Sequence, residues 1–185
     1  MERLLMQNNI DLFKFARDTK EHFFRKTGKK NNLFFFGPPS TGKTMLMRSL
    51  VDMHYNYAIL TGLQPTSAFN FANLVTRNAC FMDECRLTDN QFEQWKLLAG
   101  GQTMNTEVKY KNQLLIENCV LYTASNYEIG TYLQCGNTHD AIAERTIQYN
   151  FYHKTEFIKL NAFIWEKFWE KIWQRVTLRR DRAQY

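Results

Sequence analysis

An eight-residue stretch, Gly37-Pro38-Pro39-Ser40-Thr41-Gly42-Lys43-Thr44, constrains this chain more than any other feature of its sequence. It fits the pattern G-x-x-x-x-G-K-[ST] and directly follows the apolar run 33–36. In this pattern the glycines let the backbone curl so that several N–H groups point at one phosphate. A helix that begins near Lys43 adds its positive N-terminal end. The alternative is a chance glycine-rich turn, but the flanking strand and helix patterns favour a phosphate-binding loop. We therefore expect these eight residues to bind ATP, with Lys43 at the outer phosphates and the Thr44 hydroxyl on Mg²⁺.

Short apolar runs alternate with helical patterns over the middle of the chain. Strands are expected at 33–36, 57–60, 79–82, 119–123 and 147–151, helices at 43–53 and 89–99, and a hairpin at 103–117. Wholly apolar short strands are typical of parallel sheets buried on both faces. The pattern predicts an α/β fold, in which a central, mostly parallel sheet is flanked by helices.

The two flanks read as helices. The spacing predicts one helix over 4–26, capped by Asn9 or Asp11, and a loop over 29–32. A second, amphipathic helix is expected over 156–176, followed by a basic, frayed tail. Its expected apolar stripe is Phe157, Leu160, Ile164, Phe168, Ile172 and Val176, with Trp165, Trp169 and Trp173 beside it.

An acidic pair, Asp83-Glu84, follows the apolar strand 79–82. A phosphoryl-transfer site needs carboxylates at the end of a strand neighbouring the phosphate loop. We expect Asp83 to hold Mg²⁺ and Glu84 to polarise the attacking water. By itself such a pair is usually a solvated cap or loop, and the phosphate loop upstream is what favours the functional interpretation.

Composition excludes several classes of protein. Hydrophobic residues make up 44% of the 185 residues, which is too many for a disordered chain, and no apolar run is long enough to span a membrane. The four cysteines show no C-x-x-C spacing, so buried thiols are favoured over zinc ligands or a disulfide framework. The net charge of +6 suggests an anionic partner only weakly.

The basic excess lies in the flanks. Residues 1–36 and 151–185 each carry eight basic and four acidic side chains, whereas residues 37–150 carry eight basic and ten acidic ones. The bulk charge is therefore poor evidence that the central part binds DNA.

Several motifs in order resemble one known family. GPPSTGKT, ACFMDE, WKLLAGGQTMNTEVKYKN and VLYTASN follow one another as in a superfamily 3 helicase, and the chain is similar to the helicase domain of parvovirus and densovirus large non-structural replication proteins. The similarity covers about residues 31–152. It implies an AAA+-like P-loop ATPase core at 31–152, an N-terminal remnant of an oligomerisation bundle at 1–30, and a C-terminal helix with a basic tail at 153–185.

The resemblance assigns two further catalytic roles. Asn126, directly after the strand 119–123, matches the polar residue that senses the γ-phosphate or positions water. Arg145 matches the arginine finger that a neighbouring subunit supplies. Without the resemblance, Asn126 is a common turn residue and Arg145 an ordinary salt-bridged surface arginine.

The family also implies a DNA contact. Lys109 and Lys111 lie in the expected hairpin and match lysines that grip single-stranded DNA in the central channel of a hexamer. Tyr110 departs from the small residue that the family usually has between them. Short basic turns are otherwise usually just solvated. The implied function is an ATP-dependent helicase motor that moves 3′ to 5′ and replicates a small DNA virus in the host nucleus. No histidine pair is present for nicking chemistry.

Two rivals remain open at this point. One is an ATP-switched module that orders an oligomer on DNA or a partner with little hydrolysis, against which Glu84 argues. The other is a P-loop kinase, but no arginine-rich lid is evident.

Overall fold

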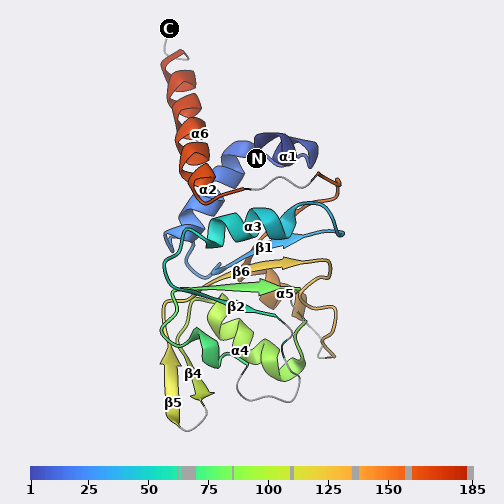
Figure 1. The fold of residues 1–185 in the computed structure, drawn as a ribbon, viewed down its shortest axis with the longest axis vertical. Helices are drawn as coiled ribbons and strands as arrows, with labels where there is room; N and C mark the ends of the chain where they lie inside the picture. Colours follow the sequence, from blue (N-terminus) through green and yellow to red (C-terminus); the bar gives the residue numbers. More distant parts are fainter. Residues whose placement is uncertain are drawn as a thin grey trace.

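The computed structural model describes residues 1–61, 63, 70–84, 86–108, 111–134, 138–156 and 160–182, without the side chains of 108, 111, 112 and 176–182. Within this part of the chain a five-stranded sheet has the order β2-β3-β6-β1-β7, and every neighbouring pair is parallel. The strands are β1 (Asn32–Phe36), β2 (Tyr57–Leu60), β3 (Ala79–Asp83), β6 (Val120–Ser125) and β7 (Thr146–Asn150). This confirms the predicted α/β fold with a parallel sheet between helices (Figure 1).

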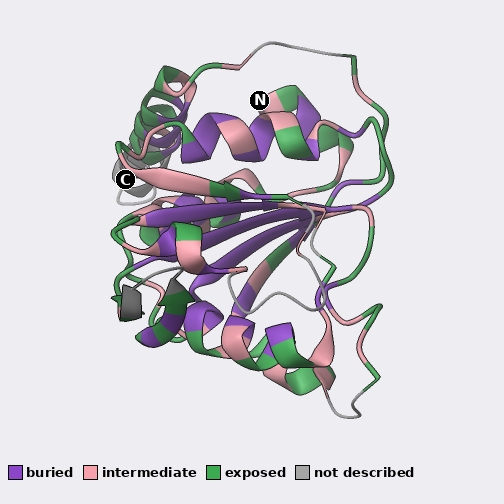
Figure 2. Cartoon of the chain, turned by 60° about the horizontal axis from the view of Figure 1, so that its bottom comes forward, coloured by how far each residue is buried: buried purple, intermediate pink, exposed green. Residues whose placement is uncertain are grey.

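The apolar runs became strands because both faces of the sheet are covered. All six residues of β6 are buried, as are the first four of β1 and of β3. Figure 2 shows the central strands as the most deeply buried part of the molecule. With helices on both sides, no strand needs the polar alternation of a half-exposed sheet.

One face of the sheet carries an aromatic core. It is covered by α1 (Glu2–Gln7), α2 (Leu12–Phe23), α3 (Lys43–Val51) and α6 (Phe163–Arg182) (Figure 1). Phe15 of α2 stacks between Phe35 of the sheet at 5.8 Å and Trp165 of α6 at 5.9 Å between ring centroids. Both flanks of the chain therefore share one core with the sheet.

The other face is covered by α4 (Asp89–Ala99) and α5 (Thr138–Ala143), with a short 3₁₀ turn at Ala72–Leu74. Phe92 and Trp95 of α4 are buried and stacked at 5.5 Å, as their spacing predicted. The antiparallel hairpin β4 (Met104–Val108) and β5 (Lys111–Ile116) projects from this side (Figure 1), which confirms the predicted hairpin. The side chains of Cys80 and Cys119 are buried, as the sequence predicted, while Cys85 and Cys135 lie outside the described residues.

Two predictions for the N-terminal part of the chain are wrong, one for a helix and one for the loop after it. The expected helix 4–26 is split into α1 and α2, because Asn9 adopts a left-handed φ of 54° and Asp11 caps α2 by accepting a hydrogen bond from the Lys14 N–H. Phe15 lies on the buried face of α2, and Phe24, directly after the helix, is 54% exposed. The expected loop 29–32 is also shorter, since Asn32 already belongs to β1.

The C-terminal helix begins and ends later than expected. It runs over Phe163–Arg182 rather than 156–176, so the helix continues through most of the expected frayed tail. Its buried stripe is Trp165, Phe168, Trp169 and Ile172, and Trp173 is 44% exposed. Phe157 lies outside the described residues. None of the described helices combines the length and the apolar character needed to cross a lipid bilayer.

Candidate functional site

The phosphate-loop motif forms the turn between β1 and α3. Gly42 is the residue before α3 and has a φ of +83°, which side-chain-bearing residues rarely adopt. Gly37 has a φ of +148°, and a Cβ there would lie 1.8 Å from the backbone oxygen of Phe151. The loop therefore depends on glycine at both ends of the motif, once for backbone conformation and once for close packing against the segment after β7.

Lys43 is folded back over this loop. Its side chain is almost fully buried, and Nζ donates to the Pro38 carbonyl at 2.8 Å and to Asn126 Oδ1 at 3.0 Å. Burial lowers the pKa of Lys43, and the nearby charges of Glu84 and Asp83 oppose that shift. The two oxygens that hold the ammonium are neutral, so an anionic phosphate oxygen would bind it more strongly.

Asp83 and Thr44 meet across the gap between β3 and α3. The Thr44 hydroxyl donates to Asp83 Oδ1 at 3.3 Å. Carboxylate and hydroxyl oxygens are hard donors of the kind Mg²⁺ prefers. Among the described residues no three histidine, cysteine or acidic side chains cluster around a common point. The pair fits an ion that takes its other ligands from nucleotide phosphates and water, as Mg²⁺ does in such sites.

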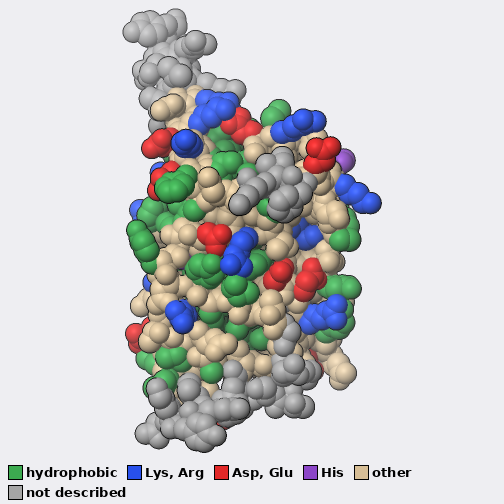
Figure 3. Space-filling view, in the orientation of Figure 1, with side chains coloured by type: hydrophobic (Ala, Val, Ile, Leu, Met, Phe, Trp, Pro, Cys, Tyr) green, Lys and Arg blue, Asp and Glu red, His purple; other side chains and the backbone are tan. Residues whose placement is uncertain are grey.

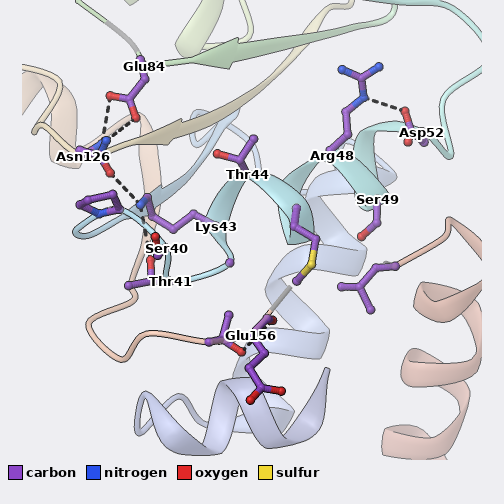
Figure 4. Close-up of a pocket in the computed structure, with 15 residues that line it drawn as sticks. Ser40, Thr41, Lys43, Thr44, Arg48, Ser49, Asp52, Glu84, Asn126 and Glu156 are labelled. Carbon is purple, nitrogen blue, oxygen red and sulfur yellow. Dashed lines mark hydrogen bonds and ion pairs between the residues drawn. The ribbon is translucent and has the colours of Figure 1, made fainter. Parts of the chain in front are cut away.

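Glu84 and Asn126 form the other half of the site. Glu84 has a left-handed φ of 53°, and its N–H donates to the Ala124 carbonyl at 2.8 Å. Its carboxylate accepts hydrogen bonds from Asn126 Nδ2 at 2.7 Å and from the Asn126 backbone N–H at 3.3 Å. Because Asn126 Oδ1 also accepts from Lys43, one amide connects the lysine to the carboxylate (Figure 4).

Lys43, Thr44, Glu84 and Asn126 line one cavity of about 810 Å³. Glu84 and Asn126 lie at one end of the cavity, and Glu156 lies at the other (Figure 4). A side wall is formed by Arg48 and Asp52 of the α3 region, which make an ion pair of 3.1 Å. A volume of several hundred cubic ångströms suits a small-molecule ligand of nucleotide size.

The fold thus brings together the residues that the sequence analysis placed around ATP and Mg²⁺. Three of them, Lys43, Asn126 and Glu84, are joined by hydrogen bonds, and Thr44 and Asp83 form a separate pair. Their catalytic roles stay predictions. The direct Lys43–Asn126 bond was not expected, although the family resemblance places both residues near the outer phosphates. The Arg48–Asp52 pair can be recognised in the sequence, because opposite charges four residues apart on a helix are neighbours.

Arg145 lies away from this site. It directly precedes β7, and its carbonyl accepts from the Asn32 N–H, so it sits at the amino edge of the sheet. The phosphate loop follows the other end of β1, roughly 17 Å along the strand at about 3.3 Å per residue. The Arg145 side chain donates to the Lys96 carbonyl at 3.1 Å and to the Ala141 carbonyl at 2.9 Å. Arg145 therefore does not serve the cavity of its own chain.

The expected DNA contacts stay untested. Lys109 lies outside the described residues, as does Tyr110. The backbone of Lys111 begins β5, but its side chain is among those not described.

One protein family and several known proteins are similar to this chain in sequence. The family described as parvovirus non-structural protein NS1 matches residues 2–160. The initiator protein NS1 of human parvovirus B19 (isolate AU) is 28% identical over 154 residues, covering 80% of this chain and 22% of that protein. The initiator protein NS1 of human bocavirus 2 is 30% identical over 132 residues, covering 69% of this chain and 17% of that protein. The chain spans about a fifth of the length of these curated relatives.

Solved structures share the fold. JCV helicase superposes with a TM-score of 0.56 at 16% identity, covering 76% of this chain and 40% of that chain. The C-terminal region of NrS-1 superposes with a TM-score of 0.54 at 15% identity, covering 91% of this chain and 41% of that chain. At these identities the likeness establishes the arrangement of sheet and helices alone.

Proposed function

Because this chain belongs to the parvovirus non-structural protein NS1 family, we propose that it is the ATP-hydrolysing helicase motor of a replication initiator. The single observation that carries the proposal is the Lys43–Asn126–Glu84 connection beside the Thr44–Asp83 pair. A phosphate-binding lysine, an oxygen pair suited to Mg²⁺ and a carboxylate for water are the parts that nucleotide hydrolysis needs.

Each side chain has one task in this proposal. The loop N–H groups and Lys43 bind and orient the phosphates, and Thr44 and Asp83 hold Mg²⁺, which supplies charge neutralisation when bound. Glu84 orients and polarises the attacking water from the end of β3. Asn126 contacts both the lysine and the carboxylate, so it is placed to respond to an outer phosphate and to reposition Glu84.

Arg145 is proposed to act between subunits. Its place at the amino edge supports this, because its side chain does not reach the cavity of its own chain. An arginine supplied by the next subunit would neutralise charge on the transferring phosphoryl group. The proposal therefore includes a homo-oligomer, a hexameric ring in the longer protein, in which each cavity is completed by a neighbour.

The remaining parts of the proposal follow the family. The β4–β5 hairpin, with Lys109 and Lys111, is assigned to single-stranded DNA, and the motor to 3′-to-5′ movement during viral replication in the host nucleus. Residues 31–152 are proposed as the motor core, with 1–30 as the end of an oligomerisation bundle and 153–185 as a C-terminal addition.

The test is steady-state ATP hydrolysis with and without single-stranded DNA, over a range of protein concentrations. We expect magnesium-dependent turnover that rises with both DNA and protein concentration and is lost in Lys43→Ala. Turnover that survives in Lys43→Ala would show that the site is wrongly assigned. Tight ATP binding with negligible turnover under all conditions would favour an ATP-switched binding module instead.

A further inference from the structure

Three exposed side chains next to the cavity form an ordered cluster. The Arg86 guanidinium lies over the rings of Tyr127 and Tyr132, 5.0 and 5.5 Å from their centroids. The two rings meet edge to face at 5.7 Å. Arg86 is exposed, and the two tyrosines are 37% and 44% exposed. We call these three residues the Arg86 cluster.

The Arg86 cluster has the character of a recognition surface. Arg86 makes no ion pair with any described carboxylate, so its charge is held by ring faces rather than neutralised. Arginine and tyrosine are the residues most enriched where binding energy concentrates in interfaces. Packing between two rings also fixes the arginine before a partner arrives, which reduces the entropy lost on binding.

The position of the Arg86 cluster relates it to catalysis. Arg86 is two residues from Glu84, and Tyr127 directly follows Asn126, so both segments leave the cavity and enter the cluster. A group from outside the chain that contacts Glu84 or Asn126 therefore comes within a few residues of the Arg86 cluster along the chain.

Two acidic residues, Asp140 and Glu144, lie near Arg145 in the sequence. Asp140 lies in α5 and Glu144 immediately precedes Arg145, and both are exposed. The ion pair recorded for Asp140 is a 3.9 Å contact with His139, and Glu144 has no ion pair with a described cation. Figure 3 shows that acidic and basic side chains are interspersed on the face in view.

We infer that the Arg86 cluster is the docking site for Asp140 and Glu144 of a second copy of this chain, and that this contact delivers Arg145 to the cavity. The inference rests on the proposed function, since it takes Arg145 to act between subunits. It follows from how the chain connects these residues. Arg86 is two residues from Glu84, and Glu144 is one residue from Arg145. If Arg145 reaches the phosphate beside Glu84, chain connectivity places opposite charges near each other.

Charge reversal tests this docking in the intact chain. The readout is the protein concentration that gives half-maximal ATPase rate, together with sedimentation in the presence of ATP. We expect Arg86→Glu to raise that concentration at least about tenfold, because it sets like charges against each other. The double reversal Asp140→Lys/Glu144→Lys is expected to do the same by itself. Combined with Arg86→Glu, it should restore the wild-type value to within about threefold.

A matched control and three contrary outcomes make the test decisive. Lys167→Glu, an exposed reversal in α6 on the other face of the sheet, should leave the association unchanged. If Arg86→Glu leaves the concentration dependence intact while Arg145→Ala abolishes turnover, the docking inference is wrong and the proposed function stands. If Arg86→Glu weakens binding to single-stranded DNA but not association, the Arg86 cluster binds DNA instead. Wild-type activity that is independent of concentration would overturn both the docking and the finger in trans, while Lys43→Ala still tests the cavity.

Discussion

The two edges of the sheet are built in opposite ways. The carboxyl edge carries left-handed backbone at Gly42 and Glu84, and its charged groups are held by neutral hydrogen-bond partners. At the amino edge the buried Asn31 side chain donates to the carbonyls of Leu98 and Cys119, both at 2.8 Å. Its backbone also bonds Ala99 and Leu121, so the side-chain amide and the backbone of Asn31 are both used within the fold.

The difference separates function from stability. Groups at the carboxyl edge keep bonding capacity for a ligand, and strained backbone persists at such sites because the surrounding fold determines it. Groups at the amino edge seal the ends of helices and strands, where an unpaired buried polar atom costs free energy. Substitutions at the carboxyl edge should therefore lower activity per folded molecule. Substitutions of sealing groups at the amino edge, such as Asn31, should lower stability, whereas Arg145 at that edge is assigned to the cavity of a neighbouring subunit.

The largest expected effect is that of Glu84→Gln at the carboxyl edge. The amide keeps the size of the side chain but removes the charge that polarises water, so we expect the ATPase rate to fall by roughly 100-fold or more. Nucleotide affinity and the free energy of unfolding should change little. Single-turnover hydrolysis, nucleotide titration and urea unfolding measure the three quantities.

The matched control for this prediction is Glu117→Gln, an exposed carboxamide substitution before β6. It should leave all three quantities unchanged. A Glu84→Gln variant that keeps at least a third of the wild-type rate would remove Glu84 from the proposed mechanism and weaken the contrast between the edges.

The next effect in size is that of Asn31→Ala at the amino edge. The alanine keeps the backbone bonds but leaves the Leu98 and Cys119 carbonyls without their side-chain donor. We expect the free energy of unfolding to fall by about 2–3 kcal/mol. The ATPase rate per folded molecule should stay within about twofold. Asn90→Ala, at an exposed position of α4, is the matched control and should cost less than about 0.5 kcal/mol.

Equal stability of Asn31→Ala and Asn90→Ala would contradict the sealing role of the amino edge. A large loss of activity in folded Asn31→Ala would show that the two edges are coupled rather than separate.

The sequence predicts the sheet well because the signal is local. Runs such as 33–36 and 79–82 are apolar without interruption, and only strands covered on both faces fit them. The predicted helix boundaries are wrong where the backbone conformation of a single residue ends a helix. Asn9 adopts a left-handed conformation that breaks α1 from α2, and nothing in the apolar spacing marks that position. Asn31 and Asn32 look like loop residues, but the fold buries both and uses them as hydrogen-bonding groups.

The residues of the site also fall into two groups, those that the sequence places together and those that only the fold brings together. The motif around Lys43 and the pair Asp83-Glu84 are continuous stretches whose chemistry depends on near neighbours, so the sequence places them together. The amide of Asn126 bonds residues from two other strand ends, which requires the sheet order β3-β6-β1 to be known. The carbonyl partners of Arg145 come from α4 and α5, and only the packed structure shows that they hold it at the far edge.

The smallest expected effect concerns pH and belongs to the amino edge. His22 is fully buried in α2, and its Nε2 donates to the Leu121 carbonyl at 3.0 Å. Burial lowers the pKa of His22 from its ordinary value of 6.5 to about 4. The unfolded chain therefore binds a proton near pH 6.5 that the folded chain does not accept until about pH 4. The stability that this neutral histidine contributes is present above pH 6.5 and is lost as the pH falls toward 4.

The variant His22→Gln isolates this contribution, because glutamine keeps a donor near the Nε2 position and does not titrate. Between pH 6 and 5 the free energy of unfolding of the wild type should fall more steeply than that of His22→Gln, by at most about 1.4 kcal/mol per pH unit. Urea unfolding of both proteins across this range measures the difference, and it is repeated in a His54→Gln background because the charge of His54 acts on His22. Parallel curves would show that His22 takes up its proton in the folded state, and the amino edge would then be open to solvent rather than sealed.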